Sequence, residues 1–285
     1  MKAEETNSIT SGYGNPPWVF KGSALYQLNL VKAETARAFI PKEFRLVEAF
    51  GYTLGGFFLA NYSDSPVGTF DELVVIGGIV WNPPTSCAWA ARVLVSSNEA
   101  CLHGRKDVGL PSYVAKFSKQ ISATPKPKSK FNTFLNMIGV GGSTNCMDIQ
   151  VSETKDTAAA DFCNINLTTG DAVNELNSGK WTGPTMKMSL PSYSGRTEYN
   201  PHLLKYSCQI DCRVKLTSPA KVLGPSAEQN DTTQHPDGEH SENKRNLSID
   251  VLLSKPILAL QFNCLKMVVE SPLMVSHGLL NPSEK

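Results

Sequence analysis

Segments in which an apolar residue recurs at every second position run through much of this chain. Such alternation is typical of strands that bury one face, and it occurs in residues 23–31, 206–216 and 261–269. Residues 52–62 and 73–81 are more continuously apolar, which indicates strands buried on both faces. The pattern therefore predicts a fold built mainly from strands.

Helical signals are few. Residues 32–39 carry helix-forming side chains and lead into Ile40-Pro41, where a helix would have to end. Residues 110–118 place Pro111 where it suits the first turn of a helix. Many strands with a few short helices favour a mainly antiparallel barrel or sandwich, and the paired glycines of the apolar segments suit the tight bends of a closed sheet.

The composition is that of an ordinary globular protein. Of the 285 residues, 41% are hydrophobic and 19% are charged, and the formal net charge is +1. A chain of this length can bury its core as one large domain or two small ones. Because the charge is near zero and no basic patch is interleaved with aromatic residues, nothing indicates nucleic-acid binding.

The seven cysteines are scattered without the spacing of a disulfide framework. Cys208 and Cys212 lie four residues apart in an alternating segment, so we expect their side chains to share one strand face. Zinc requires three or four converging ligands, and no matching Cys/His pair lies nearby. The sequence therefore predicts no metal site and no cofactor.

Polar segments predict the limits of the ordered domain. We expect flexible tails at residues 1–14 and 276–285, and a disordered insertion at residues 218–247, which are almost free of apolar side chains after Leu223. One domain would then span residues 15–275. We find no secretory signal, no clear transit peptide and no apolar run long enough for a transmembrane segment, so the sequence predicts a cytoplasmic location.

Five short elements, in order along the chain, resemble the acetoacetate decarboxylase family. They are Pro17-Trp18-Val19-Phe20, Ile40-Pro41-Lys42-Glu43-Phe44, Phe70-Asp71-Glu72, Gly104-Arg105 with Gly109-Leu110-Pro111, and Trp181-Thr182-Gly183-Pro184. The fourth resembles the turn that carries the family's catalytic lysine. The resemblance implies an acetoacetate decarboxylase-like domain, a closed antiparallel β-barrel or cone with a few short helices. Members of the family often form oligomers, so a homo-oligomer stays open.

The same turn departs from the family at the residue that performs the chemistry. The family decarboxylates through an imine on the lysine after the proline, and a second lysine beside it keeps that amine unprotonated. Those positions are Ser112 and Tyr113 here, and the family's N-terminal arginine falls near Ser23. Because a hydroxyl cannot form an imine, we do not expect this chain to be a decarboxylase.

Glu72 and Arg105 match the family, and two interpretations of them stay open. Glu72 either lines a pocket as an acid or base, or pairs with Arg105 to order the turn. Two other ideas are that Lys116 replaces the missing amine, or that Ser112 is a nucleophile with His103 as its base. The pocket candidates are Glu72, Arg105, Ser112, Tyr113, Trp181 and Met186. A pocket that has lost its cations would suit an apolar ligand.

Longer strings, at residues 12–22, 81–92 and 253–256, resemble a family of plant proteins that are required for neoxanthin formation from violaxanthin. This resemblance implies a role in carotenoid biosynthesis, upstream of abscisic acid, for a non-decarboxylating binding or accessory protein. Its partner would be an apolar, carotenoid-like molecule or an enzyme of the xanthophyll pathway. The alternative is an isomerase or hydratase that uses Glu72. The pathway would place the protein in the chloroplast, in conflict with the missing transit peptide.

Overall fold

The computed structural model describes residues 12–124, 144–155, 158–169, 183–226 and 236–275. The elements in chain order are β1 (Trp18–Lys32), α1 (Ala33–Arg37), β2 (Glu48–Ala49), β3 (Tyr52–Asp64), β4 (Phe70–Asn82), β5 (Thr85–Val95), α2 (Asn98–Lys106), β6 (Ser112–Thr124), β7 (Thr144–Lys155), β8 (Ala158–Thr169), β9 (Thr185–Gly195), β10 (Leu203–Thr217), β11 (Lys221–Leu223), α5 (Pro236–Leu253), β12 (Lys255–Val269) and β13 (Leu273–Met274). All five segments predicted as strands lie within strands, at β1, β3, β4, β10 and β12.

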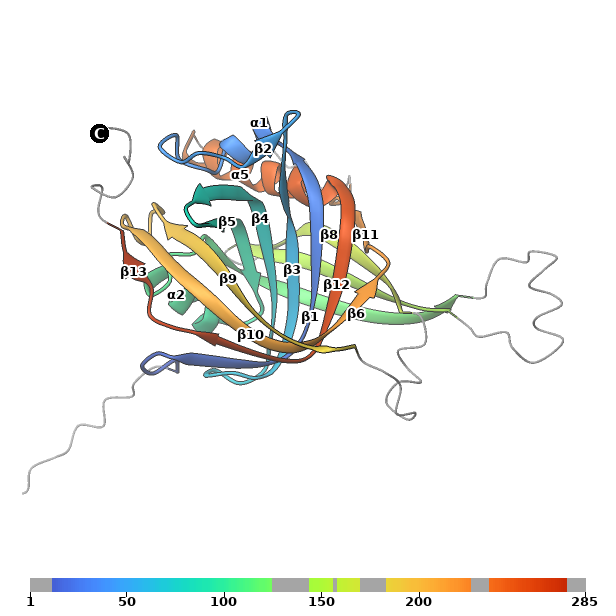
Figure 1. Ribbon diagram of the computed structural model, residues 1–285. Coiled ribbons are helices and arrows are strands. Elements are labelled where there is room, and N and C mark those ends of the chain that lie inside the picture. Colours follow the sequence, from blue (N-terminus) through green and yellow to red (C-terminus); the bar gives the residue numbers. More distant parts are fainter. Residues whose placement is uncertain (1–11, 125–143, 156–157, 170–182, 227–235, 276–285) are drawn as a thin grey trace, which may run out of the picture.

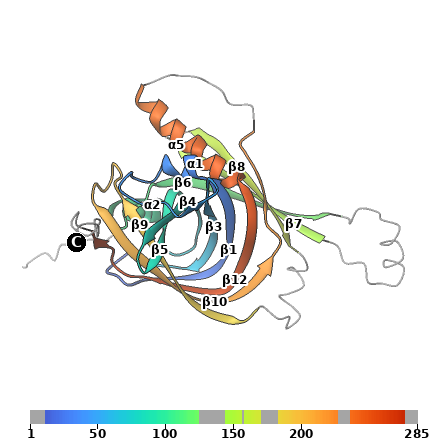
Figure 2. The ribbon, with the colours of Figure 1, turned by 45° about the horizontal axis from the view of Figure 1, so that its top comes forward.

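Seven strands form a closed barrel, which confirms the predicted fold class. Antiparallel pairing runs from β12 through β1, β3 and β4 to β5, and from β12 through β10 to β9. A short parallel pairing of β5 with β9 joins the two ends of this path. Figure 2 looks obliquely into the barrel and shows these strands around a common interior.

A second group of strands extends the sheet beyond the barrel. The start of β6 pairs in parallel with the end of β5, and β7, β8 and β11 then follow in antiparallel order. Helices α1 and α5 lie together over one end of the barrel, at the top of Figure 1. Strand β5 therefore belongs to both parts of the sheet, with one face toward the barrel interior and the other toward the outside of the barrel.

Strand alternation divides the buried side chains into two clusters. One cluster fills the barrel interior and includes Phe58, Ile210 and Phe262. The other includes Phe57 of β3 and Leu252 of α5, and it packs the outside of the barrel against the second group of strands and the helix. Neighbours such as Phe57 and Phe58 thus serve opposite faces of one strand, as the period of two requires.

The helix predicted at residues 32–39 is confirmed as α1, whereas the helix predicted at residues 110–118 is wrong. That segment enters β6, whose backbone pairs with β5 and β7. Two ladders of backbone hydrogen bonds outweigh the local preference that Pro111 signals. The helix in this region comes earlier, as α2, where Ser97 caps the first turn by accepting a hydrogen bond from the amide of Ala100.

The disorder predicted for residues 218–247 is wrong for the described part of that segment. Strand β11 and the first two-thirds of α5 fall within it. The helix is held by side chains near and beyond the end of the segment, since Arg245 is buried and Ile249 and Leu252 join the outer cluster. Residues 227–235, the predicted tail at 276–285, and residues 1–11 of the tail predicted at 1–14 lie outside the described residues.

Neither a membrane-spanning helix nor a metal cluster is found where the structure describes the chain. No helix there is long and apolar enough to cross a membrane. No group of three or more His, Cys, Asp or Glu side chains is placed to hold a metal ion within those same ranges.

Candidate functional site

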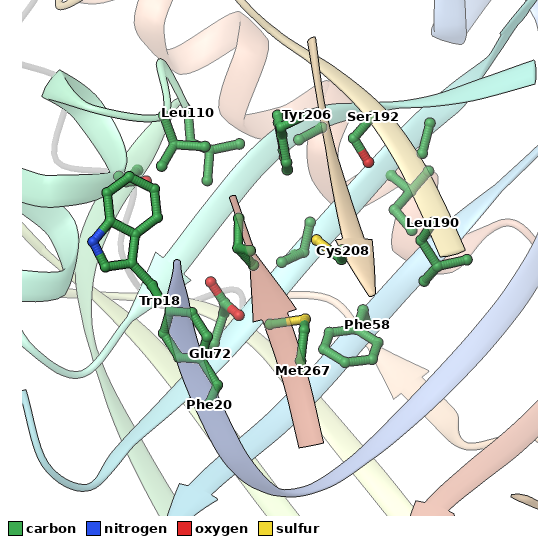
Figure 3. A pocket seen from close by; sticks show the side chains of 18 of the residues that line it. Trp18, Phe20, Phe58, Glu72, Leu110, Leu190, Ser192, Tyr206, Cys208 and Met267 are labelled. Carbon is green, nitrogen blue, oxygen red and sulfur yellow. The ribbon is translucent and has the colours of Figure 1, made fainter. Parts of the chain in front are cut away.

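The barrel encloses a cavity of about 230 Å³. Its wall is largely aromatic and aliphatic, as Figure 3 shows, and includes Trp18, Phe20, Tyr26, Phe58, Leu190 and Met267. Lysine and arginine are absent from the described residues that line it. The cavity is thus an apolar space with a few polar groups, which is the usual character of a small-molecule site.

Glu72 is the carboxylate in this wall. It lies on β4, between Ala60 of β3 and Val95 of β5, and its side chain points into the cavity (Figure 3). The hydroxyl of Tyr62, which is fully buried, donates a hydrogen bond of 2.7 Å to Glu72 Oε2. Burial raises the pKa of Glu72 from 4.5 to about 7, and the bond from Tyr62 partly opposes that rise.

These properties suit Glu72 to proton transfer. A carboxyl group with a pKa near 7 holds its proton in about half of the molecules at neutral pH, so it can act as an acid or as a base. Oε1 has no hydrogen-bond partner among the described residues. The exposed part of the side chain faces the cavity, so a ligand there can reach the free oxygen.

Ser112 also lines this cavity, at the position of the family's catalytic lysine. Its side chain is only 1% exposed, and its Oγ has no hydrogen-bond partner among the described residues. The backbone of α2 comes close at this point, because a Cβ added at Gly104 would lie 2.6 Å from Ser112 Oγ. The glycine of the predicted turn therefore makes room for the residue after the proline.

His103 lines the cavity as well, and its partners exclude the proposed nucleophile pair in this structure. Its ring stacks on Tyr13 at a centroid distance of 3.7 Å, and its Nδ1 lies 2.8 Å from Asp107 Oδ2. Burial lowers the pKa of His103, so the ring is neutral at pH 7 and the contact with Asp107 is a hydrogen bond. Since Ser112 Oγ has no partner, the Ser112–His103 couple is not formed.

Arg105 and Tyr113 lie on the other side of the wall. Tyr113 follows Ser112 on a strand, so its ring faces the outside of the barrel, where it contacts Arg92. Arg105 donates from Nε to the carbonyl of Ser112 and stacks on Tyr199. The charge pair between Glu72 and Arg105 is therefore absent, and Arg105 orders the turn through a backbone bond instead.

The remaining candidates do not contribute to the barrel cavity. Met186 is 44% exposed at the start of β9, and Trp181 lies outside the described residues. Lys116 is exposed on β6, beyond the part of the strand that closes the cavity, so it supplies no amine there. The structure thus brings Glu72 and Ser112 together in one cavity and places Met186 outside it.

Sequence reasoning missed the contribution of β10 and β12. Tyr206 and Cys208 line the cavity from β10, and Met267 does so from β12 (Figure 3). Burial raises the pKa of the Cys208 thiol to about 12, so the thiol stays protonated and unreactive. Cys208 and Cys212 do share the inner face, as predicted. The alternation that revealed that face in β10 would also have identified Tyr206.

Curated proteins from plants match nearly the whole chain. A protein from Solanum lycopersicum named Protein NEOXANTHIN-DEFICIENT 1 is 60% identical over 290 aligned positions, which cover 97% of this chain and 98% of that protein. The chain belongs to the NEOXANTHIN-DEFICIENT 1 family. A NEOXANTHIN-DEFICIENT 1 protein from Arabidopsis thaliana is 59% identical over 95% of this chain and 98% of its own length. No family model matches the sequence.

Solved structures place the NEOXANTHIN-DEFICIENT 1 fold beside acetoacetate decarboxylases. The enduracididine biosynthesis enzyme MppR, complexed with pyruvate, superposes with a TM-score of 0.55 at 11% identity, over 95% of each chain. Acetoacetate decarboxylase from Legionella pneumophila superposes with a TM-score of 0.51 at 12% identity, over 97% of this chain and 92% of that one. At these identities the likeness concerns the fold, and the chemistry has to be argued from the cavity.

Proposed function

We propose that this protein supports the formation of neoxanthin from violaxanthin, upstream of abscisic acid, by binding an apolar small molecule in its barrel. The role in neoxanthin formation is suggested by the name that its relatives in three plants share. The observation that carries the binding role is the apolar cavity that has Ser112 where the related fold has its catalytic lysine.

The wall of the cavity argues for binding over decarboxylation. Imine chemistry requires an amine in the cavity, and no described lining residue supplies one. Tyr26 and Phe58 line the cavity, with their ring centroids 6.2 Å apart, and both rings contact Phe262 behind them at the same centroid distance. Such a surface gains free energy by covering conjugated or aliphatic carbon rather than a small keto acid.

The size of the cavity limits how much of a carotenoid can enter. Sites for drug-sized molecules usually have volumes of about 300–1,000 Å³, and this one has about 230 Å³. We therefore propose that one end of the polyene occupies the barrel. An oxygen on that end would meet Glu72 Oε1 or Ser112 Oγ, two polar atoms that make no hydrogen bond with the described residues.

Absorption spectroscopy tests direct binding. Purified protein is mixed with violaxanthin or neoxanthin, and the polyene band is followed for a shift and for co-elution with the protein. Ala88 lines the cavity, so Ala88→Phe should fill it and abolish the shift. Ala49 is exposed on β2, and Ala49→Phe serves as the matched control. If neither pigment binds the unmodified protein, direct binding is wrong and a role through a partner enzyme is favoured.

The titration of Glu72 favours a second candidate function, an isomerase or hydratase. Its carboxyl group combines a pKa near 7 with a free oxygen on the cavity, which is what acid–base catalysis requires. Glu72→Gln should then fail to restore neoxanthin in a plant that lacks the protein. Asp64→Asn removes an exposed carboxylate on β3 and should restore it fully. Full rescue by folded Glu72→Gln would rule out this candidate.

Residual decarboxylase chemistry can be tested separately. Borohydride reduction in the presence of acetoacetate traps an imine as a stable mass increase on lysine. Because the described wall of the cavity carries no lysine, we expect no such increase. A trapped adduct would contradict the inference that Ser112, in place of the lysine, prevents imine formation in this chain.

A further inference from the structure

A second cavity, of about 330 Å³, lies on the outer side of the barrel wall. It is formed between the outer face of β5, the start of β6, the segment after β9, and α5. Its lining includes Trp89, Arg92, Tyr113, Arg196, Tyr199 and Lys244. In contrast to the cavity in the barrel, this one is surrounded by cations.

Arg92 in this lining belongs to a buried cluster with excess positive charge. Arg92 is 2% exposed and places Nη2 2.5 Å from Oε1 of Glu153, which is 1% exposed. Arg245, 8% exposed, reaches the same carboxylate from α5, with its Nε 3.5 Å from Glu153 Oε2. Two guanidinium groups thus share one carboxylate, which leaves a net charge of +1 among the three side chains.

The hydrogen bonds of this cluster are incomplete. The Nε atoms of Arg92 and Arg245 have no hydrogen-bond partner among the described residues, and neither has Glu153 Oε2. The 3.5 Å contact between Arg245 and Glu153 is therefore an attraction of charges without a hydrogen bond. A buried charge is stable only when it is paired and hydrogen-bonded, so the excess charge calls for an anion.

Other acids near the cavity are mostly engaged. Glu43 pairs with Arg196 at 3.0 Å. Asp161 Oδ2 accepts hydrogen bonds from Ser226, whereas the buried Oδ1 of Asp161 has no hydrogen-bond partner among the described residues. Glu198 remains as an acid in the lining, next to Tyr199. Lys244 adds a positive charge to the lining, because it is exposed there and makes no ion pair with a described residue.

Another cation, Arg105, approaches the cavity behind Tyr113. The guanidinium of Arg105 lies 5.5 Å from the centre of the Tyr113 ring and 4.1 Å from that of Tyr199. The guanidinium of Arg92 lies 3.8 Å from the centre of the Tyr113 ring. The aromatic wall is thus backed by two arginines, which favours a planar or aromatic anion against it.

We propose that this second cavity binds a small organic anion through a carboxylate or phosphate group. The anion neutralises the excess charge at Arg92, and Lys244 contributes a second cation from the rim. A guanidinium group matches both oxyanions with paired hydrogen bonds, and the rings of Trp89 and Tyr113 cover the body of the ligand. This site is independent of the barrel cavity and of the function proposed for it.

Isothermal titration with inorganic phosphate, pyrophosphate and citrate, at constant ionic strength, tests the proposal. We expect saturable binding of at least one of these anions at one site. Lys244→Ser should weaken it about fivefold, the effect of losing a partly exposed ion pair. Lys187→Ser removes an exposed lysine outside the cavity and should leave the affinity unchanged. Preference for citrate or for the phosphates then identifies the oxyanion.

Arg92→Lys provides the stronger test, since it keeps the charge and removes the forked donor. Affinity should fall by more than in Lys244→Ser, provided that circular dichroism shows an unchanged fold. Because Lys244 is exposed, its variant keeps the proposal testable even if Arg92→Lys does not fold. The proposal is wrong if none of the three anions binds at millimolar concentration, or if folded Lys244→Ser and Arg92→Lys both bind as the unmodified protein does.

Discussion

The hydroxyl of Tyr62 donates a 2.7 Å hydrogen bond to Glu72, the carboxylate in the wall of the barrel cavity. The phenol comes from β3 and the carboxylate from β4, two residues beyond Phe70, which pairs directly with Tyr62. Because the phenol donates, it stabilises the ionised carboxylate against the loss of water around it. The hydrogen bond therefore keeps the pKa of Glu72 near 7, so that the carboxyl group is not fully protonated at neutral pH.

Removing the donor should raise the pKa of Glu72. In Tyr62→Phe the burial remains and the opposing hydrogen bond is lost, so the pKa should rise above 7. Carbon NMR of labelled glutamate measures this directly. Above pH 8 the variant should also lose about 1.5–3 kcal/mol of stability, as expected for a bond to a charged group. Tyr26→Phe, in the same wall, should leave the pKa of Glu72 unchanged. If the pKa of Glu72 does not rise in Tyr62→Phe, the prediction is wrong.

The stability of the protein should depend on pH through Glu72. The folded state binds this proton more tightly, with a pKa of about 7 against 4.5 for an unburied glutamate. The contribution of Glu72 is therefore largest below pH 4.5 and falls as the pH rises through 7, by about 3 kcal/mol in total. The difference in unfolding free energy between the unmodified protein and Glu72→Gln, measured with urea from pH 4 to 8, isolates this contribution. A difference that grows in favour of the unmodified protein with rising pH would have the wrong sign.

Gly104 and Ser112 should be strongly coupled. An alanine at a helical glycine usually stabilises a protein by about 1 kcal/mol, but at Gly104 the added methyl group would meet Ser112 Oγ at 2.6 Å. We expect Gly104→Ala to be destabilising, and Ser112→Ala to be neutral or stabilising because its buried hydroxyl has no partner. In the double variant the contact is relieved, so Gly104→Ala should become favourable. Additive effects in urea unfolding would show that the two residues do not touch.

The cluster around Glu153 should be sensitive to the loss of its carboxylate. Glu153→Gln leaves two buried guanidinium groups without a counter-charge and should cost about 3–5 kcal/mol in unfolding free energy. Asp64→Asn breaks an exposed pair with Lys21 and should cost less than about 1 kcal/mol. Similar values for the two variants would show that the buried cluster is solvated.

The strands were predictable because their signal is local. Alternation in β1, β10 and β12 and continuous apolar runs in β3 and β4 follow directly from which faces are buried. The closure of the barrel was only implied by the resemblance, since it depends on Ala88 meeting Ser192 more than a hundred residues later. No periodicity within either strand encodes that pairing.

The site was predictable in part, for a related reason. Glu72 and Ser112 were identified from motifs of the family, and the structure brings both to one cavity. Tyr113 was misplaced because the segment after Pro111 was expected to be helical, and in a strand the next side chain faces the opposite way. The signal of Ser97 as a helix cap was present in the sequence and would have placed the helix before the turn.

The pairing of β5 with β9 has a consequence for access to the barrel. It joins two residue pairs, Ala88 with Ser192 and Trp89 with Tyr193, whereas the other ladders around the ring run for most of a strand. Ala88 and Ser192 both belong to the cavity wall. The shortest ladder of the barrel thus lies beside the cavity. Separating β5 from β9 would break the fewest strand pairs, so it is the least costly way for an elongated ligand to enter or leave the barrel.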